Sequence, residues 1–197
     1  MSSELRILLI DSSPERALAL EQKFLVAGFS DVFRIPAASN LVEEVARQSP
    51  DIVIIDMAIA DRDALEGVRE LSARSPRPVV MFTDEEDPAF AEQAIAAGVC
   101  SYNLSGVATR DVKLIVTSAI ALFRRYRDVE SELAETKTLL TERRLIERAK
   151  ALLMRDRSMT EPEAYAWLRR KAMNANRKIA QIAADLLEAE VRHGRAK

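Results

Sequence analysis

The sequence is poor in residues that interrupt or cross-link a chain. Its 197 residues include only 5 glycines, 7 prolines, one cysteine and one histidine. The scarcity of glycine and proline excludes collagen-like and proline-rich chains and favours a regular, helix-rich structure. A single cysteine cannot form an internal disulfide, and one cysteine with one histidine cannot supply a zinc cluster.

Long apolar runs are also missing. The sequence has no stretch of about 18 apolar residues, and its N-terminus has no signal-peptide core. We therefore expect no membrane span and a cytoplasmic location. Hydrophobic residues nevertheless make up 48% of the chain and charged residues 30%, a balance that favours a packed core over disorder.

The net charge of −2 conceals an asymmetry between the two halves. Residues 1–120 carry a net charge of −8, whereas residues 121–197 carry +6. Residues 143–178 alone contain 11 basic and 4 acidic side chains. Such a split indicates two modules with different partners, and the basic module has the charge to bind nucleic acid. The alternative is an ordinary solvated surface of charge-rich helices.

Short apolar runs alternate with amphipathic segments over the first 120 residues. The runs predict five strands, at residues 5–10, 32–35, 52–55, 78–82 and 99–104. Strands that are apolar on both faces and alternate with helices are typical of a parallel sheet covered on both sides. The predicted fold is a doubly wound, five-stranded parallel α/β domain.

A linker helix is predicted at residues 121–141, continuing from the last helix of the first domain. It contains no glycine or proline, and its apolar positions alternate in steps of four and three residues. This heptad seam consists of Leu122, Tyr126, Val129, Leu133, Thr136 and Leu140. The pattern predicts a dimeric coiled coil; the alternative is a single amphipathic helix packed on its own domain.

Residues 142–197 predict three short helices. Thr160, Pro162 and Glu163 form a capping-box pattern that starts the second of them. A unit of this size buries little apolar surface. We therefore expect an all-α domain that packs against the preceding helix for part of its stability.

Polar residues follow three of the predicted strands. Asp11 and Ser12 follow the first strand, Asp56 the third and Thr83 the fourth. Ligands of open α/β sheets bind at the carboxyl ends of the strands, where neighbouring carboxylates can share Mg²⁺ and one can accept a phosphoryl group. The alternative is that these acids only cap loops and helices.

Residues 1–120 resemble a response-regulator receiver domain. The resemblance implies that Asp56 is the phosphoacceptor, that Thr83 is the hydroxyl residue reporting the phosphate, and that Asp11 belongs to the acidic pair. Ser12 replaces the second acid of that pair, and Ser105 stands at or beside the position of the family's lysine. We therefore expect weak Mg²⁺ binding at most, at Asp11 and Asp56, and no main switch by phosphorylation.

The segments at residues 143–154, 163–169 and 172–179 are similar to the ANTAR domain, a three-helix RNA-binding antiterminator module. Ala151 departs from the glycine that many members have. With the receiver-like half, the order of parts resembles the NasT and AmiR group of regulators. NasT-like proteins, which govern nitrate and nitrite assimilation, are the most similar.

The ANTAR resemblance implies binding to two stem-loops in a leader mRNA, which prevents a terminator hairpin from forming and needs no catalytic residue. The expected RNA-contacting residues are Arg143, Lys150, Tyr165, Arg169, Arg170, Asn176, Arg177 and Lys178. The group further implies a homodimer and an inhibitory partner that senses nitrate or nitrite, similar to NasS. No cofactor is required by this function.

Two other functions stay open. The chain could be a phosphorylation-activated two-component regulator that binds DNA, although the last three helices show no clear recognition helix. It could also be a coiled-coil adaptor without a nucleic-acid role.

Overall fold

The computed structural model of the chain describes residues 5–11, 13–36, 40–58 and 62–194. The chain forms two compact units, Met1–Arg127 and Asp128–Lys197, and the boundary between them lies inside one helix. None of the helices in the described ranges is long and apolar enough to cross a membrane. The predicted division at residues 120 and 141 stays a prediction.

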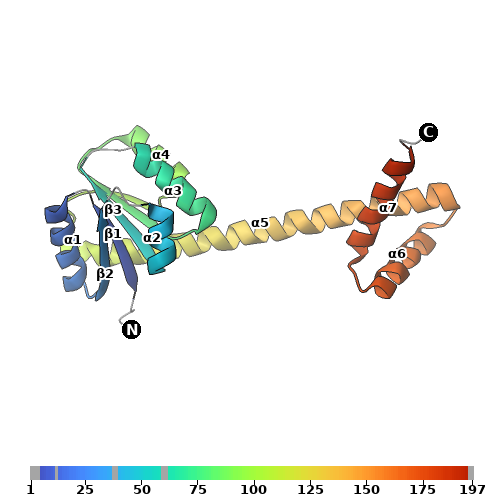
Figure 1. The fold of residues 1–197 in the computed structure, drawn as a ribbon, viewed down its shortest axis with the longest axis horizontal. Helices are drawn as coiled ribbons and strands as arrows, with labels where there is room; N and C mark the ends of the chain where they lie inside the picture. Colours follow the sequence, from blue (N-terminus) through green and yellow to red (C-terminus); the bar gives the residue numbers. More distant parts are fainter. Residues whose placement is uncertain (1–4, 12, 37–39, 59–61, 195–197) are drawn as a thin grey trace. The chain divides into compact units, whose positions relative to one another are not determined.

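The first unit contains a five-stranded parallel sheet with the order β2-β1-β3-β4-β5 (Figure 1). The strands are β1 (Arg6–Asp11), β2 (Asp31–Pro36), β3 (Ile52–Met57), β4 (Val79–Thr83) and β5 (Ser101–Leu104). The predicted doubly wound parallel α/β fold is therefore confirmed. Only β5 is clearly shorter than its apolar run indicated.

Helices cover both faces of this sheet. One face packs against α2 (Leu41–Gln48), α3 (Arg62–Arg74) and α4 (Pro88–Ala97). The other packs against α1 (Pro14–Val26) and the first turns of α5 (Thr109–Arg157).

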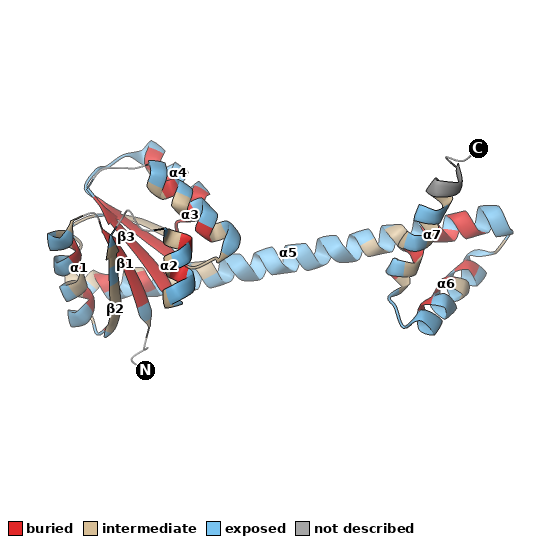
Figure 2. Cartoon of the chain, in the orientation of Figure 1, coloured by how far each residue is buried: buried red, intermediate tan, exposed pale blue. Residues whose placement is uncertain are grey.

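Strand β3 shows why the central strands have continuous apolar sequences. Val53 and Ile55 belong to the cluster on the α2–α4 side, whereas Ile52 and Ile54 belong to the cluster under α1 and α5. Because successive side chains of a strand point to opposite faces, both sets are buried (Figure 2).

Helix α5 is 49 residues long. The prediction of a separate first helix after residue 141 is wrong, because the linker and that helix are continuous. No glycine or proline occurs between Gly106 and Pro162 to interrupt the helix. It ends at Arg157, where Ser158 takes a left-handed φ of 51°.

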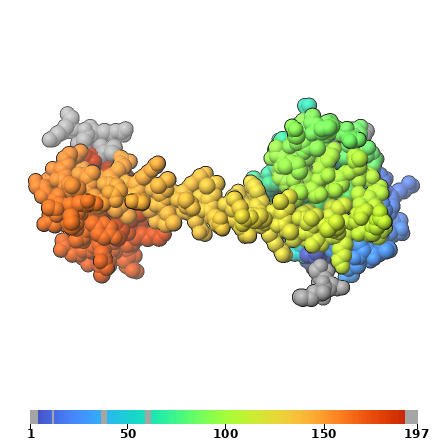
Figure 3. Space-filling view, turned by 180° about the vertical axis from the view of Figure 1, so that it is seen from behind, coloured from blue at the N-terminus to red at the C-terminus, as the bar shows by residue number. Residues whose placement is uncertain are grey.

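The middle of α5 is open to solvent. Every side chain from residue 121 to 141 is exposed except the half-buried Phe123 (Figure 2). The face of this stretch that is seen from behind is drawn in yellow and orange in Figure 3. The seam residues Leu122, Val129 and Leu133 are 57%, 45% and 51% exposed. The structure therefore does not show the alternative, in which the linker helix packs its apolar seam on its own domain.

The second unit combines the end of α5 with α6 (Glu161–Ala175) and α7 (Ile179–Gly194). Its buried core is small and rich in alanine: Ala149, Leu153, Ala164, Leu168 and Ala183. The predicted capping box is present, because the Glu163 carboxylate accepts hydrogen bonds from both the backbone N–H and the hydroxyl of Thr160, each at 2.8 Å.

Candidate functional sites

Asp11, Asp56 and Thr83 meet at the carboxyl edge of the sheet, as predicted. In the strand register, Asp11 lies opposite Asp56 and Met57 lies opposite Thr83. All three polar residues are buried, with exposed fractions of 6% for Asp11, 7% for Asp56 and 0% for Thr83. Buried carboxylates this close together need a compensating cation or proton.

Ser105 joins this cluster from the loop after β5. Its backbone N–H donates to the Thr83 carbonyl oxygen at 2.7 Å, and its hydroxyl donates to Asp56 Oδ1 at 3.3 Å. Ser105, which stands at or beside the predicted position of the family's lysine, thus contacts the candidate phosphoacceptor through a neutral group. Ser12 lies outside the described residues.

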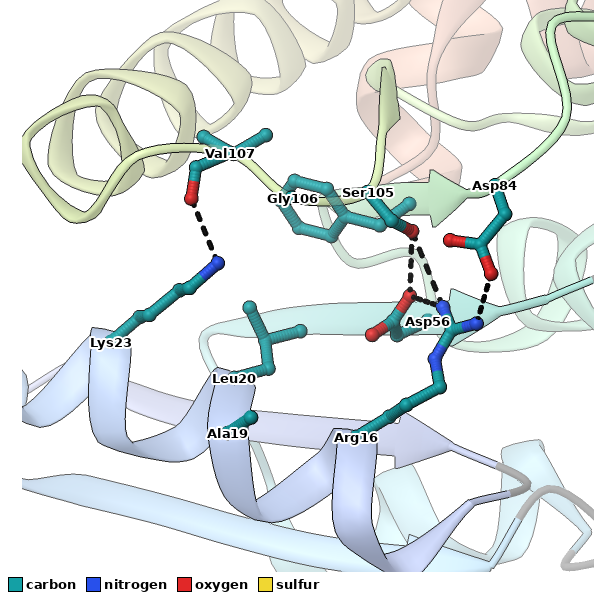
Figure 4. Close-up of a pocket in the computed structure, with 10 residues that line it drawn as sticks. Arg16, Ala19, Leu20, Lys23, Asp56, Asp84, Ser105, Gly106 and Val107 are labelled. Atoms are coloured by element: carbon teal, nitrogen blue, oxygen red, sulfur yellow. Dashed lines mark hydrogen bonds and ion pairs between the residues drawn. The ribbon is translucent and has the colours of Figure 1, made fainter.

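The cation of the site is Arg16, which the sequence did not reveal. It projects from the first turn of α1 into the cluster, where its side chain is 25% exposed (Figure 4). Its Nη2 donates to Asp56 Oδ1 at 2.5 Å and to Ser105 Oγ at 3.2 Å. Its Nη1 donates to Asp84, and its Nε lies 4.0 Å from Asp11 Oδ2.

The pKa values of two groups follow from these interactions. Burial, with a further contribution from the negative charge of Asp56, raises the pKa of the Asp11 carboxyl above its ordinary value. Partial burial lowers the pKa of the Arg16 guanidinium, but hydrogen bonding and attraction to Asp56 outweigh it, so the pKa is raised. Arg16 is therefore firmly charged.

A cavity of about 300 Å³ lies beside the cluster, between α1 and the segment after β5. Arg16, Asp56 and Ser105 line one part of it (Figure 4). Lys23 lines another part and donates to the Val107 carbonyl oxygen at 2.9 Å. Both cations at this cavity are therefore already bonded to protein oxygen atoms.

The residues present do not fit a resident Mg²⁺. Asp11 Oδ2 is buried and has no hydrogen-bond partner among the described residues, which would suit a metal. However, the Arg16 guanidinium bonds Asp56 and faces Asp11, and no group of three or more metal-ligating side chains occurs in the described ranges. Unit charges about 4 Å apart interact by about 4 kcal/mol at an effective dielectric constant of about 20, and a divalent ion doubles this repulsion.

In the second unit, several of the predicted RNA-contacting residues are engaged in ion pairs. Lys150 is only 7% exposed, and its Nζ lies 2.8 Å from Glu147 and 2.6 Å from Glu161. These hydrogen bonds raise the pKa of Lys150 above its ordinary value. Arg177 pairs with Asp185 at 2.6 Å.

Lys178 and Asn176 lie at the turn between α6 and α7. Lys178 Nζ lies 3.3 Å from a carboxylate oxygen of Glu142, on α5. Asn176 ends α6 in a left-handed conformation with a φ of 49°. Both residues therefore hold this turn in place.

The other predicted RNA-binding residues are exposed and available. Tyr165 is 44% exposed on α6. A further set of exposed arginines has no ion pair within the described part of the chain: Arg143, Arg144, Arg148, Arg169 and Arg170. Arg144 and Arg148 were not among the residues predicted from the sequence; their spacing of four residues places them on one face of the helix.

Trp167 is half-buried, and two cations lie near its ring system. The guanidinium carbon of Arg157 is 4.8 Å from the centre of its ring system, and Lys171 Nζ is 5.5 Å away. It packs against the core of the unit, as expected for an apolar helix position.

Comparisons with known proteins agree with this architecture. The family model "Response regulator receiver domain" matches residues 7–105. The chain therefore belongs to the response regulators. The model "ANTAR domain" matches residues 134–187, so the protein is an ANTAR-type response regulator.

Two curated proteins illustrate the relationship. The transcriptional regulatory protein PdtaR of Mycobacterium tuberculosis is 28% identical over 183 residues, which are 93% of this chain and 89% of that protein. The nitrate regulatory protein of Klebsiella oxytoca is 41% identical over 61 residues, 31% of this chain and 15% of that protein.

Solved structures support the fold of the first unit. The receiver domain of the response regulator NarL from Mycobacterium tuberculosis aligns with a TM-score of 0.52 and 19% identity, covering 59% of this chain and 97% of that one. A response regulator from Thermotoga maritima aligns with a TM-score of 0.54 and 18% identity, covering 60% and 99%.

Proposed function

We propose that this chain is an RNA-binding transcription antiterminator. It binds two stem-loops in a leader mRNA, and this binding prevents an overlapping terminator hairpin from forming. The observation that carries the proposal is the ANTAR match at residues 134–187, which coincides with the exposed arginines of the second unit. Such binding needs cations for phosphates and a surface for unstacked bases.

The exposed, unpaired arginines bind most of the phosphates. Arg144 and Arg148 on α5, and Arg169 and Arg170 on α6, need not leave a carboxylate to bind a phosphate. Lys150 would have to leave both of its glutamates, so it supports the fold of the unit first.

Tyr165 is the stacking residue. It is exposed on α6, one turn before Arg169, so a loop base stacked on its ring has a guanidinium within reach of the adjoining phosphate. Asn176, Arg177 and Lys178 add polar interactions at the turn that follows.

A homodimer presents two such surfaces. The exposed heptad seam between Leu122 and Leu140 supports this part of the proposal, because it leaves apolar side chains uncovered on one side of α5. Two linked RNA-binding units favour two hairpins over one through their effective concentration.

Control comes from an inhibitory, ligand-sensing partner rather than from phosphorylation. The serine that stands in place of the family's lysine, Ser105, supports this part. A NasS-like sensor of nitrate or nitrite fits the likeness to the nitrate regulatory protein, and the acidic surface that includes Asp84 and Asp87 is its docking site.

A gel-shift titration at fixed salt tests the proposal. The probes are a two-hairpin leader RNA, each hairpin alone, and duplex DNA of the same sequence. Tighter binding to the two-hairpin RNA is expected. Equal binding to all probes would show that the basic surface attracts nucleic acids only nonspecifically. Binding only after addition of a phosphoryl donor with Mg²⁺ would favour a phosphorylation-activated regulator.

A further inference from the structure

One arginine joins the ends of four strands in the first unit. Arg16 bonds Asp56 near the end of β3, Asp84 after β4 and Ser105 after β5, and it faces Asp11 at the end of β1. All these interactions come from one planar group with five N–H donors. Figure 4 shows the guanidinium between Asp56 and Asp84.

We infer that the Arg16 guanidinium is the resident cation of the Asp56 site and that it excludes Mg²⁺ from Asp11 and Asp56. The site then keeps its charge balance without a divalent metal. This inference concerns the first unit alone and does not depend on RNA binding.

The hydrogen bonds of Asp56 carry the first part of the argument. Its Oδ1 accepts from Arg16 at 2.5 Å and from Ser105 at 3.3 Å, so this oxygen is already satisfied. A magnesium ion demands near-octahedral oxygen ligands at short distance and gives up its waters reluctantly. It would have to bind beside a guanidinium that is held by charge-assisted hydrogen bonds.

The position of Asp11 carries the second part. Its side chain is 1% exposed, and within the described ranges of the chain Oδ2 has no hydrogen-bond partner. The cation that faces this oxygen is Arg16, whose Nε lies 4.0 Å away. The positive charge of Arg16 therefore compensates the negative charge of Asp11. Without Arg16, Asp11 would be a buried carboxylate with no cation beside it, and a metal ion could bind it.

Replacing Arg16 by a neutral side chain should therefore open the site. In Arg16→Gln, Asp11 and Asp56 lose their cation but keep their places in adjacent strands. Two carboxylates at one sheet edge then attract Mg²⁺. Arg16→Lys retains the positive charge and separates the effect of charge from that of shape.

Mg²⁺ binding to the full-length protein is measured by isothermal titration calorimetry, and Mn²⁺ binding by electron paramagnetic resonance. We expect no saturable binding to the wild type up to about 10 mM Mg²⁺, and saturable binding to Arg16→Gln with a dissociation constant at least about tenfold below that limit. Arg16→Lys should behave like the wild type, and Arg16→Gln with Asp56→Asn should lose the gained site.

Arg74→Gln is the matched control, because Arg74 is an exposed arginine of the same unit that pairs with Glu70 on α3. It should leave Mg²⁺ binding unchanged. Equal Mg²⁺ affinity of wild type and Arg16→Gln would overturn the inference, and so would a failure of both to bind. If Arg16→Gln does not fold, saturable 1:1 binding to the wild type or to Arg16→Lys still overturns it.

Discussion

At the scale of single residues, Asp56 differs from a free phosphoacceptor because a guanidinium and a hydroxyl already occupy one of its oxygens. Asp56→Asn removes the negative charge that binds Arg16 and leaves every residue of the second unit unchanged. We expect its affinity for the two-hairpin RNA to change by less than about threefold, under about 0.7 kcal/mol. A loss of tenfold or more in the gel shift would restore Asp56 as the main switch.

The unpaired arginines can be tested through the salt dependence of RNA binding. Replacing Arg144 and Arg148 together by glutamine should weaken binding and lower the slope of log K against log salt by about 0.7–0.9 for each phosphate that is no longer neutralised. Arg74→Gln, which removes a positive charge from the first unit, should leave the slope unchanged. An unchanged slope in the double variant would remove these two arginines from the interface.

The capping box predicts a pH-dependent stability of the second unit. Hydrogen bonds from the backbone and hydroxyl of Thr160 hold the pKa of Glu163 below its ordinary value. Because the folded-state pKa is the lower one, the stabilisation is complete above about pH 5 and is lost as the pH falls through that pKa. Glu163→Gln should therefore lower the melting temperature at neutral pH, with a difference from wild type that shrinks toward about pH 3.

The emission of Trp167, the only tryptophan of the chain, reports this unfolding. Glu135→Gln, on the exposed middle of α5, serves as the control and should leave the melting temperature unchanged at every pH. A difference between Glu163→Gln and wild type that stayed constant throughout the acid range would contradict the assignment to the carboxylate.

Site residues could be predicted from the sequence where their location depends only on their position within one strand. Asp11, Asp56 and Thr83 each end a buried apolar run, so their meeting at one sheet edge could be predicted from the sequence. Arg16 could not be found in this way, because its role depends on how α1 lies against β3 and on the segment after β5. No local pattern encodes such long-range interactions.

At the scale of elements, the sequence predicted the strands well because each is a short apolar run bounded by polar residues. The predicted extent of α5 is wrong. The apolar pattern changes after residue 141 and suggests a helix end, although no helix-breaking residue occurs there. Whether a helix continues depends on whether its residues can all adopt helical backbone angles. The apolar pattern shows only which face of the helix packs against other parts of the protein.

The exposed seam of α5 predicts a change of oligomeric state. Leu133→Glu places a charge in the centre of the seam, where a partner helix would bury it, and should convert the dimer to a monomer. Thr138→Glu places the same charge on the opposite side of the helix and should leave the dimer intact. Light scattering coupled to size-exclusion chromatography measures both masses; a monomeric wild type would contradict the proposed coiled coil.

At the scale of the whole molecule, the two halves of the chain carry opposite net charges, −8 for the first 120 residues and +6 for the last 77. The second half therefore attracts a polyanion and the first repels one, which fits the proposed function, with RNA affinity in the second half and control in the first.

Dimerisation and RNA selection should therefore be coupled. The wild type should bind the two-hairpin RNA about 100-fold more tightly than a single hairpin, through effective concentration alone. Leu133→Glu should lose this preference and keep its affinity for one hairpin, whereas Thr138→Glu should keep both. A preference that survives in a monomer would mean that one unit reads both hairpins.

Because α5 is one uninterrupted helix, residues inserted between positions 121 and 141 do more than lengthen it. They also rotate the part of the helix that follows the insertion about the helix axis. Each inserted residue turns the rest of the helix by about 100°, and seven residues amount to nearly two full turns. Insertions of seven residues should keep the phase of the seam with the RNA-binding surface, and insertions of two or five should destroy it. Function plotted against insertion length should therefore oscillate rather than decline.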